Sequence, residues 1–327
     1  MKKIKIVLAV FMAAMSVNVM AMDSVATEKG KVENKVAESE KPKGKAIVSV
    51  FANFNMAMQN GVSKCGFQLD RSYVGYQYKL GNGLELKAVL DIGKPSSVVD
   101  YHYVAYIKNA QVSWKHKGLT LTGGMISTTQ FNMQEKFWGY RYIYKSFQDQ
   151  YKFGSSADLG LSVAYKFADW VSADVIMTNG EGYKKIQGDL GFQYGLGLTF
   201  TPVEGLSLRL YGGLNDATEA EKVNVYNYAA FVGYKNKVFS LGGEFAMMQN
   251  SGNVKSRNQL GCSVYGSVKA HKIVDVYARW DMLTSNNGWN AAKDEMAVIA
   301  GAQVKLGKYV KIAPNFRMTI PKEGECK

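Results

Sequence analysis

Cysteine, histidine and proline are all scarce in this chain. Its 327 residues include three cysteines, three histidines and five prolines. Cys65, Cys262 and Cys326 lie far apart in the sequence and allow at most one disulfide, which excludes a disulfide-stabilised scaffold and favours free thiols. The scattered histidines form no spacing that resembles a metal site, so we expect no metal and no cofactor.

Long apolar runs are also missing beyond the first residues. No segment after residue 21 approaches the roughly 18 apolar residues that a spanning helix needs. Residues 1–21, MKKIKIVLAVFMAAMSVNVMA, combine a basic start, a short apolar centre and a small-residue end, a pattern typical of a secretory signal peptide. Residues 22–44 are charged and lack aromatics, which predicts a disordered periplasmic leader before a folded domain at 45–327.

Acidic residues are outnumbered by basic ones. The chain has 40 Lys and Arg against 27 Asp and Glu, and cleavage after Ala21 removes three lysines and no acid, leaving 37 − 27 = +10. A basic exported protein favours anionic partners, which could be lipid head groups, acidic solutes or nucleic acid.

The sequence does contain a strong alternation of apolar and polar residues. In FQYGLGLTFT (192–201) the aromatic and aliphatic residues occupy every second position, and LELKAVLDIG (84–93) and DLGLSVAYKF (158–167) behave in the same way. Side chains of a strand point to opposite faces at successive positions, so each segment has one apolar and one polar face. We count about fifteen such segments: 45–58, 66–80, 84–93, 104–116, 119–126, 157–167, 170–179, 192–202, 206–213, 226–235, 238–248, 260–270, 273–283, 295–306 and 309–320.

Segment length and connection length together predict a transmembrane antiparallel β-barrel of about 14–16 strands. Most segments have about ten residues, which is enough to cross a bilayer when tilted, whereas strands of soluble proteins average about five or six. Two- to four-residue turns alternate with longer polar loops, as in outer-membrane barrels. A soluble β-sandwich would also alternate, but it would have to bury too many long strands in one thin core.

The polar face of each segment should line a water-filled lumen. Charged residues on that face mix with Ser, Thr, Gln and Gly, a composition that suits a hydrated wall better than a dry core. We interpret these charges as solvated wall residues rather than as a dedicated binding site. The candidate lumen-wall residues are Arg71, Lys87, Arg209, Arg279 and Arg317.

Three stretches of the chain resemble Gram-negative outer-membrane porins of the phosphate- and polyphosphate-selective type. They are ISTTQFNMQEKFWGYRYIYKSFQDQYKFGSSADLGLSVAYKF (126–167), FQLDRSYVGYQYKLGNGLELKAVLDIG (67–93) and NGEGYKKIQGD (179–189). The resemblance implies a sixteen-stranded barrel in the outer membrane, a homotrimer in contact with lipid, and passive diffusion of small hydrophilic solutes. The net charge of +10 suggests a preference for anions such as phosphate.

Two features depart from that family. Its phosphate-selective members carry dense ladders of basic residues, whereas this chain has six arginines. The segments counted are odd in number, although such barrels have even numbers of strands, so either a final strand is missing or one strand has been overlooked.

The aromatic and basic stretch EKFWGYRYIYKSFQDQYKFG (135–154) lies in the longest connection, 127–156, which is the third outer loop when counted from a periplasmic N-terminus. The resemblance implies that this loop folds into the lumen and narrows it; the alternative is a rigid extracellular cap. The candidate constriction residues are Lys136, Arg141, Lys145 and Lys152, beside Glu135 and Asp149.

Three other functions are alternatives to a porin: an enzyme, a nucleic-acid-binding protein and a structural barrel. A hydrolase would need a base next to a serine, but His102, His116 and His271 fall in loops and turns, so we expect no enzyme. Basic residues among aromatics can bind nucleic acid, but export makes that target implausible. A structural or adhesive barrel without an open pore is the main alternative to a porin.

Overall fold

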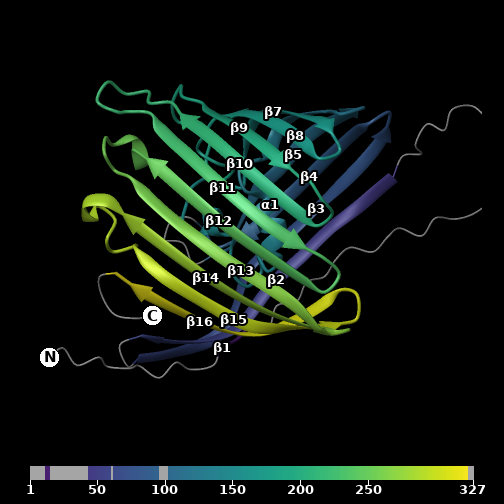
Figure 1. Ribbon diagram of the computed structural model, residues 1–327, viewed down its shortest axis with the longest axis vertical. Coiled ribbons are helices and arrows are strands. Elements are labelled where there is room, and N and C mark those ends of the chain that lie inside the picture. The colour runs from purple at the N-terminus through teal and green to yellow at the C-terminus, as the bar shows by residue number, and fades with distance from the viewer. Residues whose placement is uncertain (1–11, 15–42, 60–61, 96–101, 323–327) are drawn as a thin grey trace, which may run out of the picture.

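The folded part of the chain is a single antiparallel β-sheet that curls round on itself. The computed structural model describes residues 12–14, 43–59, 62–95 and 102–322. Each described strand pairs with its neighbour along the chain from β2 to β16, and β1 pairs with β16 (Figure 1). The strands are β1 (Met12–Ala14), β2 (Lys43–Gln59), β3 (Val62–Gly81), β4 (Leu84–Gly93), β5 (Val104–His116), β6 (Leu119–Ser127), β7 (Ala157–Ala168), β8 (Val171–Thr178), β9 (Gln193–Phe200), β10 (Leu206–Asn215), β11 (Val225–Lys235), β12 (Phe239–Gln249), β13 (Gln259–His271), β14 (Val274–Ser285), β15 (Glu295–Leu306) and β16 (Val310–Pro321).

The alternation of the sequence decides which face of the sheet turns outward. In β9, Tyr194, Leu196 and Leu198 are exposed, whereas Gln193 and the glycines between them are buried. The same outward apolar face recurs on nearly every strand from β3 to β15. Exposed apolar side chains around a closed sheet are costly in water and favourable in lipid, because lipid chains replace water at that surface.

Tight turns join the strands at one end of the sheet and longer loops join most of them at the other. Asn82 and Lys117 adopt left-handed φ values of 52° and 50° in their turns, and Gly205 and Gly307 adopt φ values of 84° and 70°. The longest loop, between β6 and β7, contains α1 (Asn132–Trp138) and α2 (Phe147–Gln150), and the 3-10 turns η1 (Ser251–Asn253) and η2 (Asn286–Gly288) lie in two later loops. No helix within the described ranges is long and apolar enough to span a membrane.

The prediction of an all-β barrel is confirmed, and all fifteen predicted segments correspond to β2–β16. Several boundaries shift. The first outer loop, expected at 59–65, shrinks because residues 62–65 continue the pairing of β3 with β2. β2 begins at Lys43, two residues before the expected start of the folded domain.

The place beside β16 is taken by β1. Met12, Ala13 and Ala14 pair with Asn315, Pro314 and Ala313 of β16. These three residues belong to the segment that the sequence predicts as a signal peptide, and cleavage after Ala21 would remove them from the sheet. The other residues of the expected signal peptide, and nearly all of the expected leader, lie outside the described residues.

The outward apolar face generates a prediction about stability in lipid. Leu210 lies near the middle of β10 and points outward with 53% of its surface exposed. Leu210→Arg should lower the free energy of unfolding by roughly 2–4 kcal/mol, the cost of a basic side chain on the lipid face at mid-depth. Denaturant titration of the protein folded in phospholipid vesicles measures this change.

Val203→Arg is the matched control, because Val203 is equally exposed but lies in the turn between β9 and β10. It should change the free energy of unfolding by less than about 0.5 kcal/mol. Equal losses in the two variants would contradict the assignment of the outward face to lipid.

Candidate functional site

The loop between β6 and β7 folds into the barrel instead of standing above it. Helix α1 lies within the ring of strands (Figure 1). Trp138 is 2% exposed and packs edge-on against Tyr265 of β13 and Tyr277 of β14. Tyr140 stacks on Tyr277 with ring centroids 4.3 Å apart. This loop therefore has its own apolar core against the inner wall.

Glycines in the wall make room for the rings of the loop. Phe137 packs against Phe231 of β11, and a Cβ atom at Gly233 would lie 2.7 Å from the Phe137 ring. Gly233 is eight residues from Val225, where β11 leaves the loop end of the barrel, a distance of about 27 Å along an extended strand. The loop thus reaches deep into the lumen, which the alternative of an extracellular cap does not allow.

Arginines of the wall hold the loop by its carbonyl groups. Arg209 donates to the carbonyl of Thr129 at 2.8 Å, Arg279 to that of Lys145 at 2.7 Å and Arg317 to that of Ile143 at 2.5 Å. Three wall strands, β10, β14 and β16, thereby fix three points along the loop.

Two of these arginines are themselves held by carboxylates. Arg209 pairs with Asp174 at 2.7 Å, and the fully buried Arg279 pairs with Asp281 at 2.7 Å. Removing one partner of such a pair costs about 3–5 kcal/mol, because the other charge is left buried and unpaired. The guanidinium groups are consequently fixed before they meet the loop.

Amide and hydroxyl groups of the loop also form hydrogen bonds with the wall. Gln148 donates to Glu244 of β12 at 3.1 Å, and the Tyr142 hydroxyl donates to Gln303 of β15 at 2.5 Å. Along the β11–β16 side the loop and the wall thus bury their polar groups against each other. On this side the packing leaves a cavity of about 220 Å³, lined by Phe137, Trp138 and Tyr140 of the loop and by polar residues of β11–β16.

Two larger cavities also border the loop. One of about 780 Å³ lies toward the loop end of the barrel and is lined by Arg71, Lys145, Lys152 and residues of the β8–β9 loop. A second, of about 340 Å³, lies along the turn-side parts of β2–β5 and is lined by Tyr73, Lys87, Arg141 and their neighbours. Both cavities contain water-sized space, and members of one group of charged side chains line each of them.

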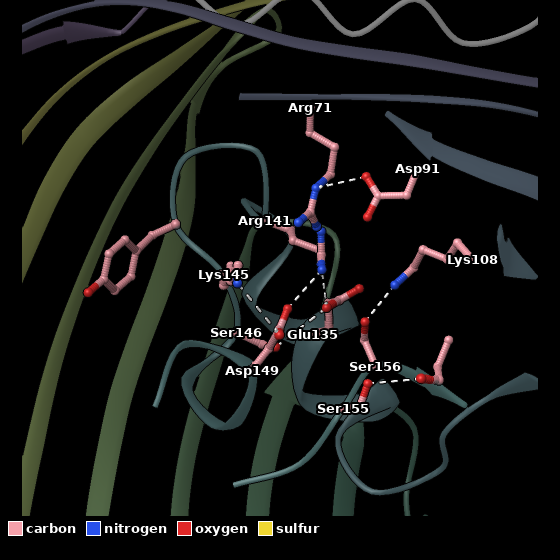
Figure 2. A network of polar contacts seen from close by, with 12 residues as sticks. Arg71, Asp91, Lys108, Glu135, Arg141, Lys145, Ser146, Asp149, Ser155 and Ser156 are labelled. Carbon is pink, nitrogen blue, oxygen red and sulfur yellow. Dashed lines mark hydrogen bonds and ion pairs between the residues drawn. The ribbon is translucent and has the colours of Figure 1, made fainter. Parts of the chain in front are cut away.

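Figure 2 shows this group, which we call the charged junction: Arg71, Asp91, Lys108, Glu135, Arg141, Lys145 and Asp149. Arg141 is its centre, donating to Glu135 at 2.7 Å and to Asp149 at 2.8 Å from the loop, and to the Tyr73 hydroxyl at 2.7 Å from β3. Around it, Arg71 pairs with Asp91 at 3.1 Å and Lys145 approaches Asp149 at 3.9 Å. The junction therefore ties the loop to the β3–β5 wall across the remaining space.

The charged side chains of the loop shift one another's pKa values. Burial alone would lower the pKa of Arg141, but Tyr73, Glu135 and Asp149 raise it well above the ordinary value, so the guanidinium stays charged. Burial alone would raise the pKa of Asp149, but Arg141 and Lys145 outweigh it and hold that pKa below its usual value. For Lys145, burial lowers the pKa in spite of Asp149.

The structure brings together only some of the residues singled out from the sequence. Glu135, Arg141, Lys145 and Asp149 all belong to the charged junction. Lys152 lines the loop-side cavity, whereas Lys136 is exposed and takes no part in the junction.

The candidate lumen-wall residues also form two groups, one that lines cavities and one that lies beneath the loop. Arg71 and Lys87 line cavities, as expected of a hydrated wall. Arg209 and Arg279 are 5% and 2% exposed and lie beneath the loop with Arg317, so their interpretation as solvated wall residues is wrong. Their charges are used for attachment, because the loop covers the wall from which they project.

Two residues of the site, Tyr73 and Lys108, were not singled out from the sequence. Tyr73 falls on the inward parity of β3, as Asp91 does on β4, so the alternation alone places both in the lumen. Lys108 falls on the apolar parity of its predicted segment and could not have been found in that way. Among the described residues, no group of three or more His, Cys, Asp or Glu is arranged to hold a metal ion.

The lowered pKa of Asp149 generates a prediction about the attachment of the loop. The ionised carboxylate stabilises the folded loop at pH values above its unfolded pKa of about 3.9. This stabilisation is lost as the pH falls through the lower folded pKa. At pH 7, Asp149→Asn should therefore speed hydrogen exchange of the backbone amides of residues 139–151 by about tenfold or more, since a hydrogen bond to a charged group contributes roughly 1.5–3 kcal/mol.

Mass spectrometry of exchanged peptides measures the ratio of variant to wild-type rates at each pH. The ratio should remain high down to about pH 5, fall at lower pH, and approach one only when the pH drops below the lowered pKa of the wild-type carboxylate. A ratio of one at pH 7, or one that does not change with pH, would show that the ionised carboxylate does not hold the loop.

No protein-family model matches the chain, and no curated protein matches it either. Solved structures do: the outer-membrane expressed OmpT of Vibrio cholerae superposes with a TM-score of 0.61 at 15% identity, covering 87% of this chain and 89% of that one. An anion-selective porin from Comamonas acidovorans gives a TM-score of 0.63 at 13% identity, covering 85% and 89%. The outer membrane channel DcaP of Acinetobacter baumannii gives 0.57 at 10% identity, covering 86% and 99%. The chain therefore has the fold of these outer-membrane porins and channels.

Proposed function

We propose that this protein is a porin of a Gram-negative outer membrane that passes small hydrophilic solutes by diffusion and prefers anions. The observation that carries the proposal is the pair of cavities, each of which is lined by residues of the charged junction. A structural barrel needs neither cavity, whereas a diffusion channel needs wet space on both sides of a narrow point.

The outward apolar face supports a place in the membrane. From β2 to β16 each strand pairs its backbone with its neighbours and carries apolar side chains on the outer face, which is how a sheet satisfies its backbone groups in lipid. We further propose that residues 1–21 direct export and are removed, so that β1 does not belong to the mature barrel. Lipid is then the principal partner of the outer face.

The packing of the loop supports a constriction. Aromatic packing narrows the space on the side toward β11–β16 to a cavity of about 220 Å³, and a larger cavity of about 340 Å³ lies along β2–β5, beside the charged junction. The loop between β6 and β7 therefore sets the width of the passage, and its attachment to the wall keeps that width constant.

Charge supports the preference for anions. The junction contains four cations, Arg71, Lys108, Arg141 and Lys145, and three carboxylates, Asp91, Glu135 and Asp149, which leaves +1 from 4 − 3. Lys152, Lys184 and Lys185 add positive charge to the loop-side cavity. A low-dielectric wall concentrates the field of such charges in the passage and raises the local concentration of anions.

Two further proposals concern the oligomeric state of the protein and its chemical role. OmpT of Vibrio cholerae has been solved in a trimer form, and we propose a homotrimer for this chain as well. We assign it no catalytic role and no nucleic-acid partner.

One observation favours the alternative of a structural barrel without an open pore. Arg141 of the loop donates to the Tyr73 hydroxyl of β3, and this hydrogen bond crosses the space between the loop and the wall. If this bridge is never open, the cavities do not communicate and no solute passes.

Recordings from purified protein in planar bilayers separate the two functions. A porin should give discrete conductance steps, and a potassium chloride gradient should give a reversal potential on the anion-selective side. Membranes that receive correctly folded protein and show no steps would favour the structural barrel, and a cation-selective reversal potential would sink the anion preference.

The role of the loop can be tested by shortening it. Replacing residues 135–152 by a short Gly-Ser linker should raise the single-channel conductance, because it removes most of α1, all of α2 and the loop half of the charged junction. Deleting residues 219–222, an exposed part of the β10–β11 loop, is the control and should leave conductance unchanged. Unchanged conductance in the first variant would show that the loop does not limit the passage.

A further inference from the structure

A β-bulge in β5 changes which residues of that strand face the lumen. Val89 of β4 pairs with Asn109, and the next residue, Leu90, pairs with Ile107, so Lys108 has no partner on β4. An extra residue of this kind lets two consecutive side chains point to the same face, and bulges of this type are common next to functional sites.

The exposed fractions of the side chains along β5 show that inward and outward positions are exchanged at the bulge. On the turn side of the bulge, Val112 is 48% exposed and points outward, and Asn109 is 3% exposed and points inward. Strict alternation would then send Lys108 outward into the apolar face and Ile107 inward. Instead Ile107 is 54% exposed on the outer face, and Lys108 joins Asn109 on the inner one.

The side chain of Lys108 is in contact with the linings of both cavities. Its side chain lines the turn-side cavity. Its Nζ atom donates to the Ser156 hydroxyl at 2.5 Å and lies 4.4 Å from the centre of the Tyr183 ring, and both of those residues line the loop-side cavity.

Lys108 differs from the other cations of the junction in its partners. Arg71, Arg141 and Lys145 each lie within 4 Å of a carboxylate. For Lys108 no carboxylate of the described ranges lies within that distance, and its ammonium group is met by a hydroxyl and aromatic rings. The three carboxylates balance the three other cations, so the net charge of +1 at the junction is that of Lys108.

We propose that Lys108 is the selectivity-determining residue of the passage. A small hydrophilic anion moving between the cavities meets the ammonium group and replaces the Ser156 hydroxyl as its partner. A cation meets an uncompensated like charge at the same point. This inference rests on the proposed porin function, and it assigns the anion preference to a residue that the bulge puts in place.

Charge substitution tests the role. In reversal-potential recordings, Lys108→Met should lower the anion-to-cation permeability ratio by roughly five- to tenfold, because one unscreened charge within a few ångströms of the permeating ion is lost. Lys108→Arg should retain the ratio, and Lys108→Glu should reverse the preference.

Lys115→Met is the matched control. Lys115 lies on the same strand and the same inward parity, seven residues or about 24 Å nearer the turns, and it is exposed. It should leave the ratio close to that of wild type. If Lys108→Met leaves the ratio unchanged, or lowers it no more than Lys115→Met does, the role of Lys108 is overturned.

Thiol labelling tests the placement independently of selectivity. In a variant with Cys65, Cys262 and Cys326 replaced by serine, Lys108→Cys should react with a water-soluble methanethiosulfonate and Ile107→Cys should not. Mass spectrometry reads out the reaction, and the reverse pattern would overturn the bulge. Absence of conductance in the wild-type protein would overturn the porin proposal, whereas conductance with unchanged selectivity in Lys108→Met would overturn this inference alone.

Discussion

The burial of one loop's aromatic side chains against the inner wall is the constraint on which the rest of this structure depends. Trp138 and Tyr140 cannot remain in a wet lumen without cost, and Tyr277 gives them an aromatic surface to cover. Gly233 leaves the wall space for Phe137. Burial of apolar area drives the loop inward, and the position of the passage follows from the side that the loop takes.

The same constraint gives charged residues two different tasks. Beneath the loop, Arg209 and Arg279 are paired, buried and bound to loop carbonyls, so their charges hold structure and do not face solutes. On the open side, Arg141 joins the loop to β3 while Lys108 keeps an uncompensated charge in the charged junction. Under the proposed porin function, selectivity would depend on which charges remain free of carboxylates, more than on the total of +13.

Much of this architecture could be predicted from the sequence, for a physical reason. Paired strands with lipid on one face must alternate, so the period of two identifies β2–β16, and the order of turns and loops identifies the third outer loop. The local pattern could not show which arginines the loop would cover, because that depends on contacts between residues more than a hundred positions apart, such as Arg279 and Lys145. Nor could it place Lys108, because a bulge depends on the register with β4 and reverses the parity that the pattern assumes.

A disulfide between the loop and the deep wall tests the central claim most directly. In the serine background for Cys65, Cys262 and Cys326, the Phe137→Cys/Gly233→Cys variant should form an intramolecular disulfide on mild oxidation, detected as a linked peptide pair by mass spectrometry. Phe137→Cys with Gly243→Cys, whose site faces outward on β12, should not form one. Free thiols in the first variant, with the barrel folded, would contradict a loop packed deep within the lumen.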